Sequence, residues 1–111
     1  ISLCFFPFIS LAVPNSLKIG FVSDYSGKGA FFGIQTQRGA LIAKEFLEAN
    51  KSNTGVLPLQ LIFEDTQGET KNALTSVLKL LDVENVDAVV CDLTSICTAI
   101  SPKLAVAKKP L

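Results

Sequence analysis

The fold is decided by one stretch of the sequence, Val86-Asp87-Ala88-Val89-Val90-Cys91-Asp92-Leu93-Thr94-Ser95. Its first six residues are rich in β-branched side chains and predict a buried strand, and a helix is expected to open at Thr94-Ser95. The first backbone N–H groups of a helix have no partner within it and carry partial positive charge, so this turn can hold a carboxylate or a phosphate. The alternative interpretation is that Ser95 only caps the helix.

Strands and helices alternate along the rest of the chain. Apolar and β-branched runs predict further strands over 17–23 and 57–64. Apolar residues at helical spacing predict helices over 34–50, 69–82 and 95–107. Helices of this length between strands form βαβ units, so the predicted fold class is α/β with a parallel sheet. Lys109-Pro110 is expected to lead into a fourth strand.

The predicted sheet is incomplete, because a doubly wound lobe needs about two or three more strands to cover its faces. The chain is therefore expected to be the N-terminal part of such a lobe, a fragment with about three strands and three helices. The buried face of each helix also follows from the spacing. We expect the first helix to bury Gly39, Ile42, Ala43, Phe46 and Leu47, and the second to bury Leu74, Val77, Leu78 and Leu81.

Composition excludes several classes of function. Ten basic and ten acidic residues cancel, and the lysines are scattered, so nucleic acid is not an expected partner. The sequence contains no histidine, which removes the usual general base and the commonest metal ligand. Hydrolytic triads are therefore not expected, and we assign no catalytic residue, no cofactor and no metal.

The first residues form an apolar run that is typical of a signal peptide. It is too short to span a bilayer, and Pro7 and Pro14 interrupt it. We interpret residues 1–12 as a signal-peptide remnant that is cleaved after Ala12, and residues 13–111 as the incomplete lobe. A buried N-terminal strand is the alternative. The leader predicts an exported protein, in the periplasm or outside the cell.

Two cysteines, Cys91 and Cys97, remain after the leader is removed. An oxidising compartment permits a bridge between them, but one ends a strand and the other lies in the first turn of the next helix. We expect two small buried thiols rather than a disulfide. A metal site is not supported, because two cysteines at this spacing supply too few ligands.

The glycines Gly27, Gly29 and Gly33 follow a strand and precede a helix, as in a dinucleotide-binding loop. The fingerprint of that loop is G-x-G-x-x-G, and here the last gap is one residue too long. The predicted loop, 24–33, is also too long for the tight turn that aims a helix at a pyrophosphate. A dinucleotide-binding enzyme fragment is therefore the least favoured interpretation.

Several short motifs together resemble the bacterial leucine/branched-chain amino-acid binding protein family, which are type I periplasmic binding proteins. Their order and spacing from Leu17 to Leu111 carry the resemblance. The motifs are the strand and loop from Ile19-Gly20 to Ser26-Gly27, Phe32-Gly33, Arg38-Gly39-Ala40 with Ala43, Leu59 to Asp65 before Gln67-Gly68, Val86-Asp87-Ala88-Val89 leading to Ser95, and Lys109-Pro110. The chain departs from the family at Cys91-Asp92, where Gly-Pro is frequent, and at Glu48, where Asn is frequent.

The resemblance implies a fold, a site and a role. It implies the N-terminal lobe of a two-lobed receptor, in which Ser95 binds the ligand and Phe32 forms an aromatic wall, with Thr94 and Thr98 as neighbours. Phe32 could instead be a surface aromatic packed on the lobe. The implied role is to deliver a small amino acid or related carboxylate to the membrane permease of an ABC transporter. The alternative is the ligand-sensing ectodomain of a signalling receptor.

Overall fold

A computed structural model describes residues 15–55 and 57–111. The predicted leader, residues 1–12, lies outside the described residues. The chain runs through β1 (Leu17–Ser23), α1 (Ala30–Ala49), α2 (Lys51–Thr54), β2 (Leu59–Asp65), α3 (Thr70–Asp82), β3 (Ala88–Cys91) and α4 (Thr94–Ala107). The predicted alternation of strands and helices is confirmed.

The three strands form one parallel sheet in the order β2-β1-β3. The central strand β1 sets Ile19 opposite Leu61 of β2 and Ala88 of β3. Beyond β3, the backbone N–H of Val89 donates a hydrogen bond to the carbonyl of Pro110 at 3.0 Å. Because β1 lies on one side of β3, the segment after α4 returns along the other side, where a fourth strand is expected.

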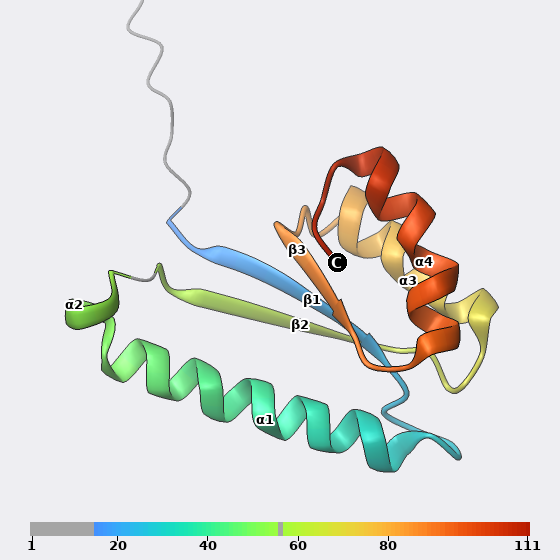
Figure 1. The fold of residues 1–111 in the computed structure, drawn as a ribbon, viewed down its shortest axis with the longest axis horizontal. Helices are drawn as coiled ribbons and strands as arrows, with labels where there is room; N and C mark the ends of the chain where they lie inside the picture. Colours follow the sequence, from blue (N-terminus) through green and yellow to red (C-terminus); the bar gives the residue numbers. More distant parts are fainter. Residues whose placement is uncertain (1–14, 56) are drawn as a thin grey trace, which may run out of the picture.

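Helices cover both faces of the sheet: α1 lies on one face, and α3 and α4 lie on the other (Figure 1). The main core is on the second face. Its fully buried members are apolar side chains from two strands, the segment before β3 and the two helices, namely Val22, Ala73, Val77, Leu80, Val86, Val89, Ile96, Ile100 and Leu104. On the first face, the rings of Phe21 and Phe63 pack with centroids 5.0 Å apart.

The buried faces predicted for the first two helices were wrong in part. In α1, Ile42 and Phe46 are 68% and 66% exposed, and the buried residue is Gly33. In α3, Ala73, Ser76, Val77 and Leu80 are buried, whereas Leu78 is exposed. Apolar residues occur on more than one side of each helix, so the spacing alone does not show which side packs on the sheet.

Element boundaries also differ from the prediction in places. The first helix begins at Ala30, so the loop before it is shorter than the predicted 24–33, and the loop-length argument against a dinucleotide site no longer holds. The polar cluster after this helix forms the short helix α2. The third strand begins at Ala88, although Val86 is fully buried.

We expect residues 17–111, expressed alone, to aggregate or to unfold without cooperativity. Strand β3 has an edge on the side where a fourth strand is expected, and Val90 and the α1 side chains Ile42 and Phe46 leave apolar surface in water. Light scattering and a thermal unfolding curve test this expectation. A soluble monomer that unfolds cooperatively would contradict it.

Candidate functional site

The carboxyl ends of the three strands meet at one edge of the sheet. Ser23 lies opposite Asp65, and Val22 lies opposite Cys91, so all three strands finish at about the same height. The turns that follow them, and the N-terminus of α4, gather at this edge (Figure 1). In open parallel sheets this is the edge where ligands bind.

Asp65, at the end of β2, holds the loop after β1 in place. Its carboxylate accepts hydrogen bonds from the backbone N–H groups of Tyr25 at 2.9 Å and Ser26 at 3.2 Å, and from the Ser26 hydroxyl at 2.5 Å. The Gln67 N–H adds a bond of 3.0 Å. Burial raises the pKa of Asp65, but these hydrogen bonds outweigh it and hold the pKa below its ordinary value of 3.8.

Asp24, directly after β1, is buried and joins the loops after β1 and β2. Its carboxylate accepts hydrogen bonds from the Thr66 hydroxyl and from the Gly68 N–H, the latter at 2.7 Å. A side chain at Gly29 would overlap this carboxylate, and one at Gly33 would overlap the Asp24 backbone carbonyl. Close packing around Asp24 therefore explains Gly29 and Gly33, whereas Gly27 has a left-handed backbone conformation with φ +77°.

Asp92 connects the turn after β3 to β1 and α1. Its two carboxylate oxygens accept hydrogen bonds of 2.6 Å each from the hydroxyls of Ser23 and Thr36. Sequence reasoning missed Asp24, Asp92 and Thr36 as site residues. Only the departure from Gly-Pro at Cys91-Asp92 gave any signal in the sequence that this turn is unusual.

Tyr25 lies close to this network. Its ring meets Phe63 edge to face with centroids 5.7 Å apart, and its hydroxyl is buried without a hydrogen-bond partner among the described residues. Burial raises the pKa of the Tyr25 phenol well above its ordinary value, and the carboxylates of Asp92 and Asp65 raise it further. The phenol therefore stays neutral at physiological pH and keeps a proton to donate.

The predicted residues Thr94, Ser95 and Thr98 lie together at the N-terminus of α4, and all three are exposed. Helix α4 begins at Thr94, and its cap residue is Leu93, with no side-chain capping hydrogen bond. The alternative that Ser95 only caps the helix is therefore wrong. The first helical bond runs from the Cys97 N–H to the Leu93 carbonyl, so the N–H groups of the exposed residues Thr94 and Ser95 are left for solvent or a ligand.

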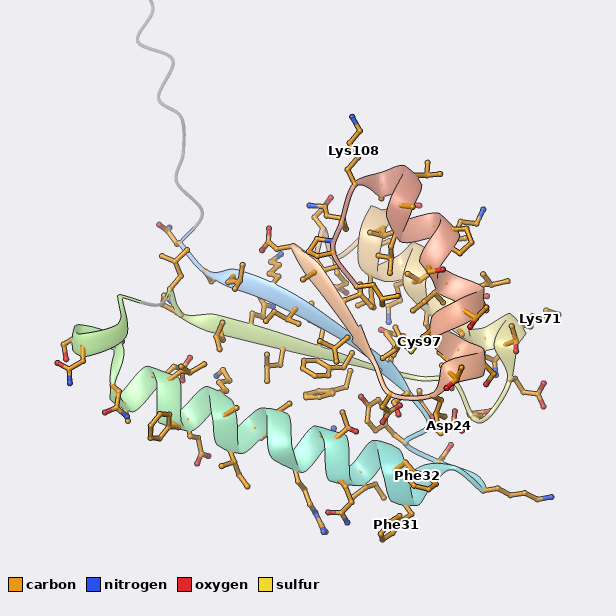
Figure 2. The ribbon with its side chains drawn as sticks, in the orientation of Figure 1. Asp24, Phe31, Phe32, Lys71, Cys97 and Lys108 are labelled. Carbon is orange, nitrogen blue, oxygen red and sulfur yellow. A yellow bond between two sulfur atoms is a disulfide. The ribbon has the colours of Figure 1, made fainter. Side chains whose placement is uncertain are left out.

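Phe32 lies in the first turn of α1, at the end of the molecule where Asp24 also lies (Figure 2). Its ring is 59% exposed and meets Phe31 edge to face, with centroids 5.6 Å apart. An aromatic side chain exposed to this degree is available to a ligand. The structure thus brings Phe32 to the same end as the α4 N-terminus.

Cys91 and Cys97 form a disulfide, so the prediction of two buried thiols was wrong. Their Cα atoms lie 5.7 Å apart, within the range that a disulfide requires, because the turn after β3 is short and folds the start of α4 back onto the strand. Both residues are partly exposed rather than buried.

A polar hollow of about 310 Å³ lies between β2 and α3 and includes Asp65 and Gln67 of the carboxyl edge. It is lined by Glu64, Asp65, Gln67, Asn72, Thr75, Ser76 and Lys79. Within it, the Lys79 ammonium lies 2.6 Å from the Glu64 carboxylate, and this hydrogen bond raises the pKa of Lys79. The two charges neutralise each other, and none of the predicted site residues lines the hollow. We therefore place the candidate site at the α4 N-terminus.

Within residues 15–55 and 57–111, the structure contains no cluster of three or more histidine, cysteine or acidic side chains able to hold a metal ion. Across the same residues, no helix is both long and apolar enough to cross a membrane.

A parallel sheet with helices on both faces is an α/β fold, and it matches the N-terminal part of a type I periplasmic binding protein fold. A profile of the family described as "Periplasmic binding protein" matches residues 16–111, and the chain belongs to this family. The predicted resemblance and fold class are confirmed. No curated protein sequence gives a significant match.

Solved structures support this assignment. A possible leucine/isoleucine/valine-binding protein from Rhodopirellula baltica is 28% identical with a TM-score of 0.79, over 90% of this chain and 28% of its own. The branched-chain amino acid transporter substrate-binding protein LivJ from Streptococcus pneumoniae, in complex with isoleucine, is also 28% identical, with a TM-score of 0.78. The match covers 86% of this chain and 28% of LivJ. A solute-binding protein from Rhodopseudomonas palustris, in complex with 3,4-dihydroxybenzoic acid, shares the fold at 18% identity, with a TM-score of 0.74. The match covers 87% of this chain and 26% of that protein. This chain thus spans little more than a quarter of their length.

The packing around Asp24 predicts opposite effects for two glycines of α1. In the complete protein, Gly33→Ala should lower the free energy of unfolding by about 2–3 kcal/mol, because the new methyl group overlaps backbone that cannot move aside. Gly39→Ala is the matched control, because a Cβ at this position meets nothing within 4 Å. This substitution should raise the free energy of unfolding by about 0.5–1 kcal/mol. Urea unfolding measures both. Equal effects of the two substitutions would refute the packing argument.

The lowered pKa of Asp65 predicts acid sensitivity. The unfolded chain takes up a proton near pH 3.8 while the folded protein does so at a lower pH, so this carboxylate stabilises the fold above that value and the contribution is lost as the pH falls below it. The difference in unfolding free energy between the wild type and Asp65→Asn should therefore shrink below pH 3.8. Denaturant unfolding from pH 7 to pH 3 measures it, with the exposed Asp82→Asn as the charge control. If the unfolding free energies of the wild type and Asp65→Asn differ by the same amount at pH 3 and at pH 7, the stabilising role of the ionised Asp65 is contradicted.

Proposed function

We propose that this chain is part of the first lobe of an extracytoplasmic solute-binding protein that delivers a small amino acid or related carboxylate to the permease of an ABC importer. One observation carries the proposal: the α4 N-terminus presents exposed Thr94 and Ser95 at the carboxyl edge of the sheet and has no side-chain cap. A helix N-terminus in this state favours an anionic group.

Two of the structural relatives point to the same chemical group. One of them is in complex with isoleucine and the other with 3,4-dihydroxybenzoic acid, and both molecules carry a carboxylate. The shared carboxylate matches the positive end of a helix, whereas the rest of each ligand differs. The ligand of this protein is therefore proposed by class, as a small carboxylate with an amino acid as the first candidate.

In the proposed mechanism, the Ser95 hydroxyl and the first N–H groups of α4 hold the carboxylate. Thr98 lies three residues after Ser95 and four after Thr94, and it neighbours both because positions three or four apart share one side of a helix. Phe32 packs against the rest of the ligand. A second lobe then closes over the ligand, and closure is favoured to the extent that the ligand binds the closed state more tightly than the open one. No step makes or breaks a covalent bond, so the protein is proposed not to be an enzyme.

The disulfide supports the proposed location outside the cytoplasm. Disulfides form and persist in the periplasm and outside the cell, and they are rare in the reducing cytosol. Cys91 and Cys97 are bonded to each other in the structure. The bond is therefore consistent with export, which the N-terminal apolar run predicted independently.

We expect Ser95→Ala in the complete protein to weaken binding of L-isoleucine or 3,4-dihydroxybenzoate, whichever the wild type binds. Hydrogen bonds to charged groups are worth about 1.5–3 kcal/mol, so the dissociation constant should rise roughly tenfold to a hundredfold. The melting temperature should change little, because the Ser95 hydroxyl is exposed and makes no capping bond. Calorimetric titration and a melting curve measure the two effects.

Ser101→Ala is the matched control, because it also removes a hydroxyl from α4. The Ser101 hydroxyl donates a hydrogen bond to the backbone carbonyl of Thr98 within the helix. Its affinity should equal that of the wild type. If Ser95→Ala and Ser101→Ala bind equally well, the binding role of Ser95 is refuted.

A further inference from the structure

We propose that the Cys91–Cys97 disulfide is a positioning device for the candidate ligand-binding turn. By closing the turn into a ring, it holds the start of α4 in the orientation in which Ser95 and the first N–H groups can receive a carboxylate. The inference rests on the proposed function, and it assigns to these two cysteines a role in ligand affinity.

The cross-link encloses the residues that matter for binding. Cys91 ends β3 and pairs with Val22 of the central strand, and Cys97 lies in the first turn of α4. Thr94 and Ser95 lie between the two cysteines, within a separation of six residues. One end of the ring is therefore fixed to the sheet, and the other end is the helix turn that carries the proposed ligand contacts.

The N-terminus of α4 needs such a device because it has no other cap. A helix usually begins with a polar side chain that accepts a hydrogen bond from a free N–H group, and here the cap residue is Leu93, which cannot do so. A side-chain cap would occupy the donors that a ligand needs. The disulfide orders the first turn while leaving those donors free.

The other contacts that hold the turn after β3 are weaker than the disulfide on the solvent-exposed side of the turn. Ile96 is buried in the core, and Asp92 accepts hydrogen bonds from Ser23 and Thr36, but the Asp92 side chain is exposed and water competes for it. Opening the disulfide leaves the first turn of α4 held by these contacts and by Leu93, which packs against the core. If the ligand-ready turn is then populated about one tenth of the time, the apparent dissociation constant rises about tenfold.

Hydrogen exchange on the complete protein tests the device without any ligand. A dithiol such as dithiothreitol delivers two electrons and two protons: the sulfur–sulfur bond breaks, two thiols form, and the reagent becomes a cyclic disulfide. Both cysteines are partly exposed, so the reagent can reach them without unfolding. Reduction should speed exchange about tenfold for the helix-bonded amides of residues 97–99 in a peptide covering 92–99, because the N–H groups of Thr94 and Ser95 have no helical partner in either state. A peptide covering α3 should be unchanged. Equal exchange in 92–99 before and after reduction would overturn the proposal.

Titration with L-isoleucine and 3,4-dihydroxybenzoate gives the functional test. Reduction should raise, by about tenfold, the dissociation constant of whichever of the two probes the wild type binds. Treating the reduced protein with diiodomethane, whose two iodides are displaced by the two thiolates to give an S–CH₂–S bridge, should restore affinity. Restoration by a bridge that cannot be reduced shows that the connection, and not the sulfur oxidation state, sets the affinity.

Leu104→Ala is the control for a purely structural role. Leu104 is buried in the same helix, so its loss lowers stability without opening the ring, and affinity should stay at the wild-type value. Lowered affinity in Leu104→Ala to the same extent as on reduction would refute a positioning role. If neither probe binds in either redox state, the proposed ligand class fails, and the exchange experiment alone decides whether the disulfide orders the turn.

Discussion

The parallel pairing of β1 with both of its neighbours is the constraint on which the rest of the structure depends. Because β2 and β3 run in the same direction as β1, the turns after Ser23, Asp65 and Cys91 reach one edge of the sheet. Gly20 in the middle of β1 allows Leu80 to approach, since a side chain there would overlap the leucine methyl groups. Helix α3 can thus pack closely on the central strand.

At the carboxyl edge of the sheet, the hydrogen-bond acceptors and the hydrogen-bond donors have different roles. The carboxylates of Asp24, Asp65 and Asp92 are all used internally, where they accept hydrogen bonds from loop N–H groups and hydroxyls. The N–H donors at the start of α4 are not used in this way. Internal carboxylates connect the loops to one another, and the uncapped helix end leaves positive potential for an anionic ligand.

Acidic residues lie at the same edge of the sheet as the proposed carboxylate site. Neutral hydrogen-bond donors stabilise a carboxylate without cancelling its charge, and the lowered pKa of Asp65 favours its charged form. The donors at the start of α4 must therefore hold an anionic ligand against this negative charge. The disulfide fits this arrangement, because it orders the turn without adding a charge or consuming a donor.

The sequence by itself determined the fold class, the order of the elements and the position of Ser95 at a helix start, because these depend on local patterns of residues. The tertiary structure alone decided which sides of α1 and α3 face the core, since both helices carry apolar residues on several sides. It also decided the disulfide, which depends on the direction in which α4 leaves the sheet, and the roles of Asp24 and Asp92. Their partners lie 42 to 69 residues away along the chain, so no local pattern could reveal them.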